Sequence, residues 1–345
     1  NRKSFSNRLM NYKSIFNLLG ILLGIFSLSF IPPLVLTFVY KESGMEIFLY
    51  SFIFFSILGS SLWAATRQQN LPLNISDGFI ITTLFWVVLA CAGSVPFYFF
   101  GLSISDSVFE SVSGITTTGA TTIIGLDNLP KSILFYRQLL QWIGGMGLII
   151  LAVAVMPALG IGGGQLYKME LPGSQGNQKL TPKITDSAKA LWKIYVGLTL
   201  ICAILYLSSG MDLFDSIAHS LSTVAGGGFS THDQSIGFFN SSLIETVCIV
   251  FMLLSAASFA VHYVAIFGGK PLKYFYDSEF RFFLSVIMLI ILISFMVHLI
   301  NNSFTDIFST FGSTIFQVVS IVTTSGFTTE NFSLWPGFLP YLLLV

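Results

Sequence analysis

Long apolar stretches alternate with short polar segments along the whole chain. A transmembrane helix needs about 20 apolar residues to cross roughly 30 Å of hydrocarbon, and seven stretches come close to this length or exceed it. The pattern predicts seven spanning helices, at 15–39, 47–65, 79–100, 133–159, 190–207, 243–267 and 282–300. The first stretch is longer than the apolar region of a signal peptide and lacks a small-residue cleavage site, which favours a retained helix.

Three shorter, half-apolar segments lie between the predicted spans and align with one another without a gap. They read DSVFESVSGITTTGATT at 106–122, DSIAHSLSTVAGGGFST at 215–231 and STIFQVVSIVTTSGFTT at 313–329. A serine recurs at one aligned position, and each copy ends in a run of glycine and hydroxyl residues. The aligned glycines are 109 and then 98 residues apart, which leaves room for two spanning helices around each segment. The chain is therefore predicted to repeat a unit of helix, short segment and helix.

Each short segment is too short to cross a membrane. Its apolar part has about ten residues, which as a helix cover roughly 15 Å, half of the hydrocarbon thickness. The glycine and threonine run must then return as extended backbone, which survives at membrane depth only where protein or water shields it. We predict three re-entrant pore loops, and the negative C-terminal end of each short helix favours a cation beside its loop.

Basic residues fall mostly on one side of this topology. The amino terminus, the turn at Arg67 and the loops 160–189 and 268–281, together with Lys193, hold thirteen of the sixteen Lys and Arg residues. By the positive-inside rule this side, with the amino terminus, is cytoplasmic. The outer side keeps Lys41, Lys131 and Arg137 against eleven acidic residues, and a net charge near minus eight attracts cations to it.

Composition supports the membrane class. The 345 residues are 54% hydrophobic and 9% charged, with a mean hydropathy of +0.80, which describes a polytopic membrane protein. The predicted fold class is all-α, with repeated helix, pore loop and helix units that follow two extra N-terminal transmembrane helices. We expect membrane lipid around it and no nucleic-acid partner.

The glycine and threonine runs suit the transport of a cation. Such a strand can turn its carbonyl oxygens to a central axis and replace the water shell of a passing ion, as the four strands of potassium channels do. Glycine supplies the backbone freedom that this needs. No carboxylate lies in these runs, which disfavours the acidic ring of a calcium channel. A large, easily dehydrated monovalent cation fits best.

Four motifs carry a family resemblance that covers essentially the whole chain. FESVSGITTTGATTIIGLDNLP, FYRQLLQWIGGMG, IAHSLSTVAGGGFSTHD and FQVVSIVTTSGFTTENF resemble the Trk-type bacterial potassium uptake subunit of the Trk/Ktr/HKT superfamily. The resemblance implies a potassium-channel-like fold with pseudo-fourfold symmetry and a homodimer with one pore in each subunit, in the bacterial inner membrane. It also implies a cytoplasmic ring of nucleotide-binding (RCK) regulatory subunits that bind ATP, ADP or NAD(H), and no organic cofactor in this chain.

The resemblance also assigns residues to the ion path. It implies filter glycines at Gly119, Gly228 and Gly326, and potassium-binding carbonyls at Thr117, Thr118, Gly226, Gly227, Thr324 and Ser325. Some plant relatives that favour sodium have serine at the first filter glycine, so Gly119 matches the potassium-selective pattern. Glu110, His219 and Gln317 share one aligned position, where each either supports the filter from behind or lies in a polar pocket; no transition-metal site is expected.

The chain divides into four regions on this interpretation. We expect an N-terminal two-helix region at 1–77, a first repeat at 78–160, a cytoplasmic loop with the second repeat at 161–267, and an incomplete third repeat at 268–345. The family has a fourth repeat, which the sequence lacks, so we interpret the chain as truncated before it. The residues that control gating are therefore left unassigned.

Some alternatives stay open. The chain is not expected to be an enzyme, because it contains no HExxH motif, no GxGD-type aspartate pair and no serine with a nearby histidine and aspartate. A sodium or mixed monovalent cation symporter is the main alternative to potassium transport, and a gated channel and a coupled symporter are not separable here. The loop 160–189 is either a docking surface for the regulatory ring or a linker, and Gly144, Gly145 and Gly147 favour close helix packing over phosphate binding.

Overall fold

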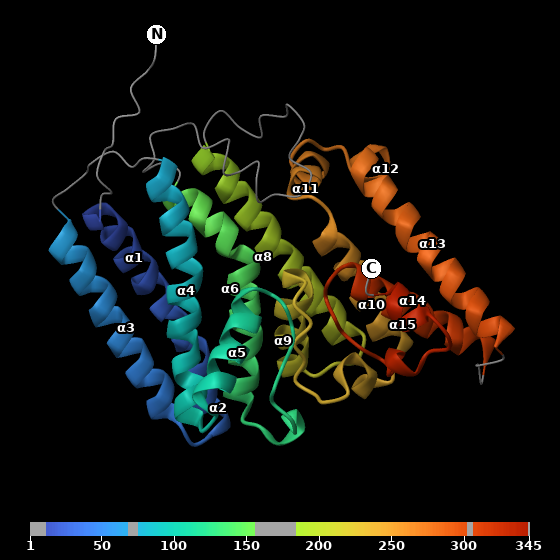
Figure 1. Ribbon diagram of the computed structural model, residues 1–345, viewed down its shortest axis with the longest axis horizontal. Helices are drawn as coiled ribbons and strands as arrows, with labels where there is room; N and C mark the ends of the chain where they lie inside the picture. Colours follow the sequence, from blue (N-terminus) through green and yellow to red (C-terminus); the bar gives the residue numbers. More distant parts are fainter. Residues whose placement is uncertain (1–11, 68–74, 156–183, 302–305, 344–345) are drawn as a thin grey trace, which may run out of the picture.

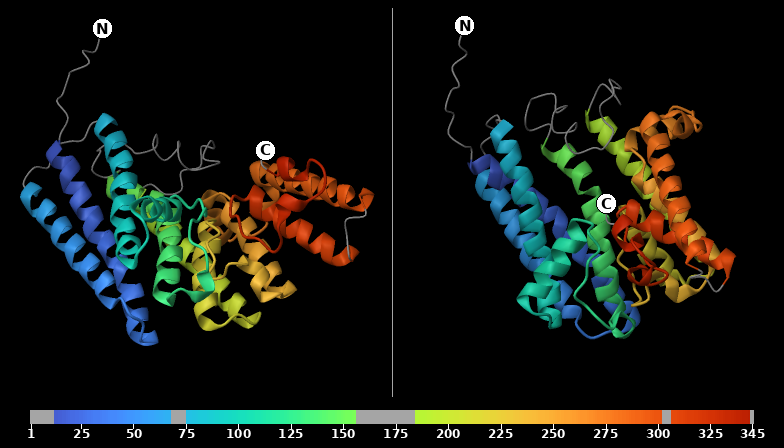
Figure 2. Two further views of the ribbon diagram at one scale, coloured as in Figure 1. Left: turned by 60° about the horizontal axis from the view of Figure 1, so that its bottom comes forward. Right: turned by 45° about the vertical axis from the view of Figure 1, so that its right-hand side comes forward.

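A computed structural model of the chain describes residues 12–67, 75–155, 184–301 and 306–343. Within these ranges every regular element is helical. The helices succeed one another from α1 and α3 at one end of the molecule to α13 at the other (Figures 1 and 2). The helices of the predicted spanning segments are α1 (Tyr12–Ser27), α2 (Ile31–Tyr40), α3 (Met45–Thr66), α4 (Ile75–Phe100), α6 (Lys131–Val155), α8 (Ile184–Ser208), α10 (Ser242–Ala256), α11 (Phe259–Ile266) and α13 (Ser278–Ile300).

Three helices too short to cross a membrane, here called the short helices, lie between these segments, as the repeat predicted. They are α5 (Ile104–Ile115), α9 (Leu213–Ala225) and α14 (Ile307–Val322), and α14 begins about one turn earlier than the other two. In each, the side chain of the N-cap residue accepts a hydrogen bond from a backbone amide of the first turn, which satisfies one of the free N–H groups at the start of a helix. The N-cap residues are Ser103, Asp212 and Asp306 respectively. The remaining helices, α12 (Lys273–Tyr276) and α15 (Leu339–Leu342), have one turn each.

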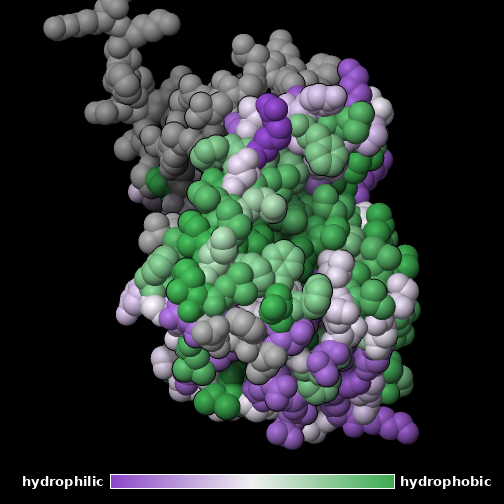
Figure 3. Space-filling model, turned by 90° about the vertical axis from the view of Figure 1, so that its right-hand side faces the viewer, coloured by the Kyte–Doolittle hydropathy of each residue, from purple (hydrophilic) through white to green (hydrophobic). Residues whose placement is uncertain are grey.

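Five described helical spans are long and apolar enough to cross a membrane. They are Tyr12–Tyr40, Met45–Thr66, Ile80–Phe100, Lys189–Ser208 and Ser278–Ile300, and each coincides with a predicted span. Hydrophobic side chains fill the middle of the molecular face at the α13 end, and hydrophilic ones gather at its lower edge (Figure 3), as a lipid-facing surface requires. The all-α membrane architecture predicted from the sequence is therefore confirmed.

Two predicted spans differ in detail from the structure. The stretch 243–267 is not one helix, because α10 ends at Ala256 and Ala257 takes an extended conformation before α11 begins. The Leu254 carbonyl then accepts hydrogen bonds from the Ala257 amide at 3.1 Å and from His262 Nε2 at 2.9 Å, which satisfies the backbone freed by the break. The first span is also interrupted, by a 3₁₀ turn at Leu28–Phe30 just before the two prolines at the start of α2.

The N-terminal helices pack closely and fix the start of α6. A Cβ on Gly59 of α3 would lie 2.8 Å from the Gly20 carbonyl oxygen of α1, so glycine permits this approach of two helices. In the turn after α2, Glu42 accepts hydrogen bonds from the amides of Lys131 and Ser132, at 2.7 and 3.1 Å. The extra helices thus hold the first turn of the helix that carries much of the site described below.

The order of the helices makes the short ones re-entrant. α4 ends and α6 begins on the lower side in Figure 1, and α5 with its following loop begins and ends on that same side. α9 likewise starts from the lower end of α8 and its loop returns there. The C-terminal end of α3 and the segment that joins α11 to α13 lie on the opposite side. These described segments, which the charge pattern placed on one side, share it; residues 1–11 and most of the loop 160–189 lie outside the described residues.

His232 joins the first two repeats. Its Nδ1 lies 2.5 Å from Asp127, which precedes α6, and its Nε2 lies 3.2 Å from Asp215 in the first turn of α9. The imidazole also stacks on Phe238, with ring centroids 3.5 Å apart, and the Asp233 carboxylate accepts the Gly125 amide at 3.0 Å. Burial opposes protonation of His232, but the two carboxylates outweigh it and raise its pKa above 6.5. The hydrogen bond with His232 lowers the pKa of Asp127 below 3.8.

These shifts predict a pH-dependent stability. A raised histidine pKa stabilises the fold at low pH, and this contribution is lost as the pH rises through the raised value. The lowered Asp127 pKa makes a separate contribution, which is lost only when the pH falls into strong acid. We expect the unfolding temperature of the purified protein to fall as the pH rises above about 6.5, and to fall less in His232→Gln. Thermal unfolding in detergent at each pH measures this. Equal pH dependence in both proteins would contradict the bridge.

Candidate ion pathway

The three segments that follow the short helices take the same backbone path. We call 116–122, 225–231 and 323–329 the first, second and third return loops. In each loop the second residue has a left-handed backbone, with φ of 55° at Thr117, 68° at Gly226 and 61° at Thr324. Two residues later comes a second left-handed position, with φ of 79°, 75° and 78° at Gly119, Gly228 and Gly326. This conformation favours glycine, so the aligned glycines have a structural reason that is common to all three copies.

The serine that recurs in the repeat closes the end of each short helix through its backbone. The carbonyls of Ser113, Ser222 and Ser320 accept the amides of Thr118, Gly227 and Ser325, at 2.9, 3.0 and 2.9 Å. A bond of this kind, from beyond the last helical turn, ends a helix and turns the chain. The three short helices therefore end, and their loops begin, with the same hydrogen-bonding geometry.

The three loops converge on one place. A Cβ on Gly119 would overlap the carbonyl oxygen of Gly227 and would lie 3.6 Å from that of Ser325. A Cβ on Gly228 would in turn overlap the Ser325 carbonyl oxygen. The carbonyls of the second and third loops therefore lie against the glycine of the preceding loop, and a side chain at Gly119 or Gly228 would have to displace backbone.

Glu110 supports the first loop from behind. Its Oε1 accepts the Thr122 amide at 2.7 Å, the Ile123 amide at 3.4 Å and the Thr121 hydroxyl. Its Oε2 accepts a hydrogen bond from Arg137 Nε at 3.1 Å, and both side chains are almost completely buried. A buried carboxylate needs such compensation, because an unpaired charge in a low dielectric is costly.

The residues aligned with Glu110 contact their loops in other ways. His219 Nε2 lies 2.9 Å from the Ser230 hydroxyl at the end of the second loop, and its Nδ1 lies 3.0 Å from the Asp215 carbonyl of its own helix. Gln317 donates from Nε2 to the Glu330 carbonyl at 3.0 Å, just past the third loop. All three side chains are buried. They share a position in the repeat but not a hydrogen-bonding pattern.

The third loop has two further attachments. From α14, the Ser320 hydroxyl donates to the Phe327 carbonyl of the loop at 2.6 Å. Thr328 of the loop also pairs with the segment that follows the second loop. The Thr328 amide donates to the Ser235 hydroxyl at 3.2 Å, and the Thr328 carbonyl accepts the Gly237 amide at 3.1 Å. The second and third repeats are thus connected next to their loops.

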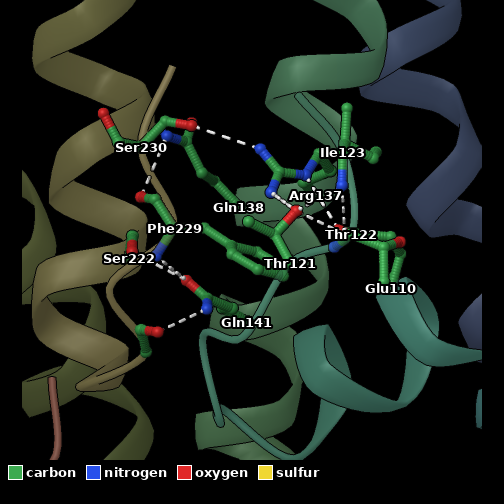
Figure 4. Close-up of polar contacts among 11 residues, drawn as sticks. Glu110, Thr121, Thr122, Ile123, Arg137, Gln138, Gln141, Ser222, Phe229 and Ser230 are labelled. Carbon is green, nitrogen blue, oxygen red and sulfur yellow. Dashed lines mark hydrogen bonds and ion pairs between the residues drawn. The ribbon is translucent and has the colours of Figure 1, made fainter. Parts of the chain in front are cut away.

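One face of α6 holds the second loop, and the sequence reasoning missed it. Arg137 donates to the Ser230 carbonyl at 3.3 Å and to the Thr121 hydroxyl at 2.9 Å (Figure 4). Its guanidinium also lies 4.2 Å from the centroid of the Phe229 ring, at a distance typical of a cation–π contact. One buried arginine therefore touches the first loop, the second loop and Glu110.

Two glutamines extend this face. Gln138 donates to the Phe229 carbonyl at 3.3 Å, and Gln141 donates to the Gly227 carbonyl at 2.6 Å (Figure 4). Gln141 also accepts from the Ser222 hydroxyl at 2.7 Å and from the Phe229 amide at 3.1 Å. Arg137, Gln138 and Gln141 are neighbours on a helix surface, and three such residues within an otherwise apolar span were the signal in FYRQLLQWIGGMG.

The structure corrects the assignment of Arg137 to the outer surface. Arg137 and Glu110 are both fully buried, because each completes the hydrogen bonding of the other and of the loops. One charge of each sign leaves the outer face together, so the predicted charge balance of that face is unchanged. The glycines of the same motif behave as predicted, since a Cβ on Gly144 would overlap the Ile115 carbonyl at the end of α5.

The residues at the convergence offer oxygen ligands from the backbone and from hydroxyls. The loops contain no aspartate or glutamate, and the nearby Glu110 carboxylate is paired with Arg137. The ends of α5, α9 and α14, where the negative ends of the helix dipoles lie, immediately precede the loops. Such a site suits a monovalent cation with few bound waters.

Comparisons with known proteins identify the family of the chain. The chain is 47% identical over 340 residues to the Trk system potassium uptake protein TrkH of Vibrio parahaemolyticus, a match that covers 97% of this chain and 70% of that protein. It is 45% identical over 339 residues to the protein of the same name from Escherichia coli, with the same coverage.

A solved structure shares the fold. The crystal structure of the potassium transporter TrkH from Vibrio parahaemolyticus superposes with a TM-score of 0.86 at 45% sequence identity, over 97% of this chain and 69% of that one. The family model of the TrkH cation transport proteins matches residues 44–345. The chain therefore belongs to the TrkH family of cation transport proteins.

Proposed function

We propose that this chain carries potassium ions across the bacterial plasma membrane, through a selectivity filter formed by the return loops. The observation that supports this most is the convergence of three loops with one repeated backbone conformation, in which the glycine of one loop lies against a carbonyl of the next. The relatives named above are potassium uptake proteins, which favours potassium over sodium as the ion.

In this proposal the backbone carbonyls replace the water shell of the ion. The filter glycines are Gly119, Gly228 and Gly326. The ligands are the carbonyls of the two residues before each of them: Thr117, Thr118, Gly226, Gly227, Thr324 and Ser325. The Gly227 carbonyl also accepts a hydrogen bond from Gln141, and its second lone pair is available to an ion. The acidic outer face would raise the local cation concentration, and salt would weaken this effect.

Filter support is proposed for Glu110, His219 and Gln317. Their contacts with residues at or just beyond the ends of the loops would keep the loops from collapsing when an ion leaves. The four-region division of the chain, with boundaries after 77, 160 and 267, is proposed on the same repeat alignment. The amino terminus is proposed to be cytoplasmic on the charge pattern, because the C-terminal end of α3 and the segment that joins α11 to α13, which carry basic residues assigned to the same side, lie together.

The filter proposal predicts a strong effect of Gly228→Asp. A side chain there would overlap the Ser325 carbonyl and would force a non-glycine residue to φ 75°. We expect at least about a tenfold loss of rubidium uptake, measured with and without competing sodium in cells that lack their own potassium uptake systems. Gly312→Ala on α14 is the control, because its Cβ would meet no described atom within 4 Å. Unchanged uptake by Gly228→Asp would refute the filter.

The support proposal predicts that Glu110→Gln destabilises the protein. The change leaves the Arg137 charge buried without its partner, which costs about 3–5 kcal/mol. We expect a lower unfolding temperature and less rubidium uptake, with part of the stability regained when Arg137→Gln is added. Thermal unfolding of the two variants and the wild type measures this. A single variant as stable as the wild type would show that the pair does not hold the loop.

A homodimer with a cytoplasmic ring of nucleotide-binding regulatory subunits is proposed on the family resemblance. We predict that ATP, ADP or NADH changes rubidium flux through the complex of the two proteins reconstituted in vesicles, and that flux through vesicles without the ring ignores these nucleotides. If none of the three nucleotides alters flux through the complex, this regulation is refuted. A monomeric mass for the purified membrane subunit would count against the homodimer.

A further inference from the structure

The backbone conformation of Gly227 does not require glycine. Its neighbours Gly226 and Gly228 both have a left-handed backbone, but Gly227 is not among the residues with positive φ. The aligned residues in the other loops are Thr118 and Ser325, so the repeat itself tolerates a side chain here. Something specific to the second loop must exclude one.

Gln141 accounts for the exclusion. A Cβ on Gly227 would lie 2.6 Å from both Nε2 and Oε1 of Gln141, well inside van der Waals contact. Gln141 is fully buried, and its amide is held on both sides, so it cannot move away without losing hydrogen bonds. With Gln141 in this place, position 227 therefore has room only for glycine.

The Gln141 amide also fixes the direction of the Gly227 carbonyl. Its Nε2 donates to that carbonyl at 2.6 Å, while its Oε1 accepts from the Phe229 amide at 3.1 Å and from the Ser222 hydroxyl at 2.7 Å. A single side chain thus connects the end of α9 with two residues of the second loop. The first loop is held mainly by Glu110 of its own short helix, whereas this contact comes from α6 of the preceding repeat.

We propose that Gln141 is a positioning residue for cation selectivity, which acts by holding the Gly227 carbonyl in place and requires glycine at 227. This inference rests on the proposed function, because Gly227 is one of its filter carbonyls. Selectivity between ions of similar charge depends on the number and placement of carbonyl dipoles, so a carbonyl freed from Gln141 would discriminate less between potassium and sodium.

The first variant is Gln141→Met, which keeps the length of the side chain but loses the donor to the Gly227 carbonyl and the acceptor of the Phe229 amide and the Ser222 hydroxyl. We expect rubidium uptake to continue while its resistance to competing sodium falls about tenfold, the effect of losing the one of these hydrogen bonds that orients the Gly227 carbonyl. The matched control is Trp142→Phe, the next residue on α6, which loses a hydrogen bond of 3.1 Å to Thr199 but touches none of the loops in the described contacts. Its sodium resistance should equal that of the wild type.

A second pair of variants tests the fit between the two residues. Gly227→Ala should lose rubidium uptake because its methyl group overlaps the Gln141 amide, and adding Gln141→Ala should restore uptake with weakened sodium resistance. All proteins are expressed from the complete gene in cells without their own potassium uptake, and amounts of folded protein are measured by detergent gel filtration.

The outcomes separate the two proposals. A wild type that takes up no rubidium would refute the proposed function. A selective wild type whose sodium resistance is unchanged in Gln141→Met would refute the role of Gln141 alone. If Gln141→Met does not fold, the second pair decides: restored uptake supports the matched fit, and equal loss in Gly227→Ala with and without Gln141→Ala refutes it.

Discussion

The hydrogen bonding of irregular backbone at membrane depth is the constraint on which this structure depends. Water is absent from hydrocarbon, so the amides and carbonyls outside a helix must find partners within the protein or along a water-filled path. The return loops meet this demand from behind, through the recurring serine carbonyls and through Glu110, Gln141 and Arg137. Polar residues that would be costly in an apolar helix are therefore concentrated where the chain leaves helical geometry.

The three repeats meet this common demand with unequal means. The first loop is attached to a carboxylate, the second to amides and an arginine of α6, and the third to a serine hydroxyl and the segment that follows the second loop. A shared backbone conformation thus coexists with different side-chain partners. The repeat conserves the loop geometry within this chain, while the contacts between repeats make each loop distinct.

Local features of this fold could be predicted from the sequence, and contacts between repeats could not. Helix spans, short helices and the special glycines depend on hydropathy, length and backbone conformation, which act over a few neighbouring residues. The role of Arg137 depends on Glu110, Thr121 and Ser230, which lie in other parts of the chain, so charge counting placed it at the surface. The break between α10 and α11 was hidden because its residues are small and apolar enough to continue a helix.

The attachment of the second loop to α6 also has a consequence for biogenesis. α6 precedes α9 by several dozen residues in the chain, and membrane chains are completed from the amino terminus onward, with earlier units folding first. Arg137, Gln138 and Gln141 therefore leave the ribosome before the second loop does. The earlier helix can serve as a template for the later strand, so that its unpaired backbone spends little time facing lipid.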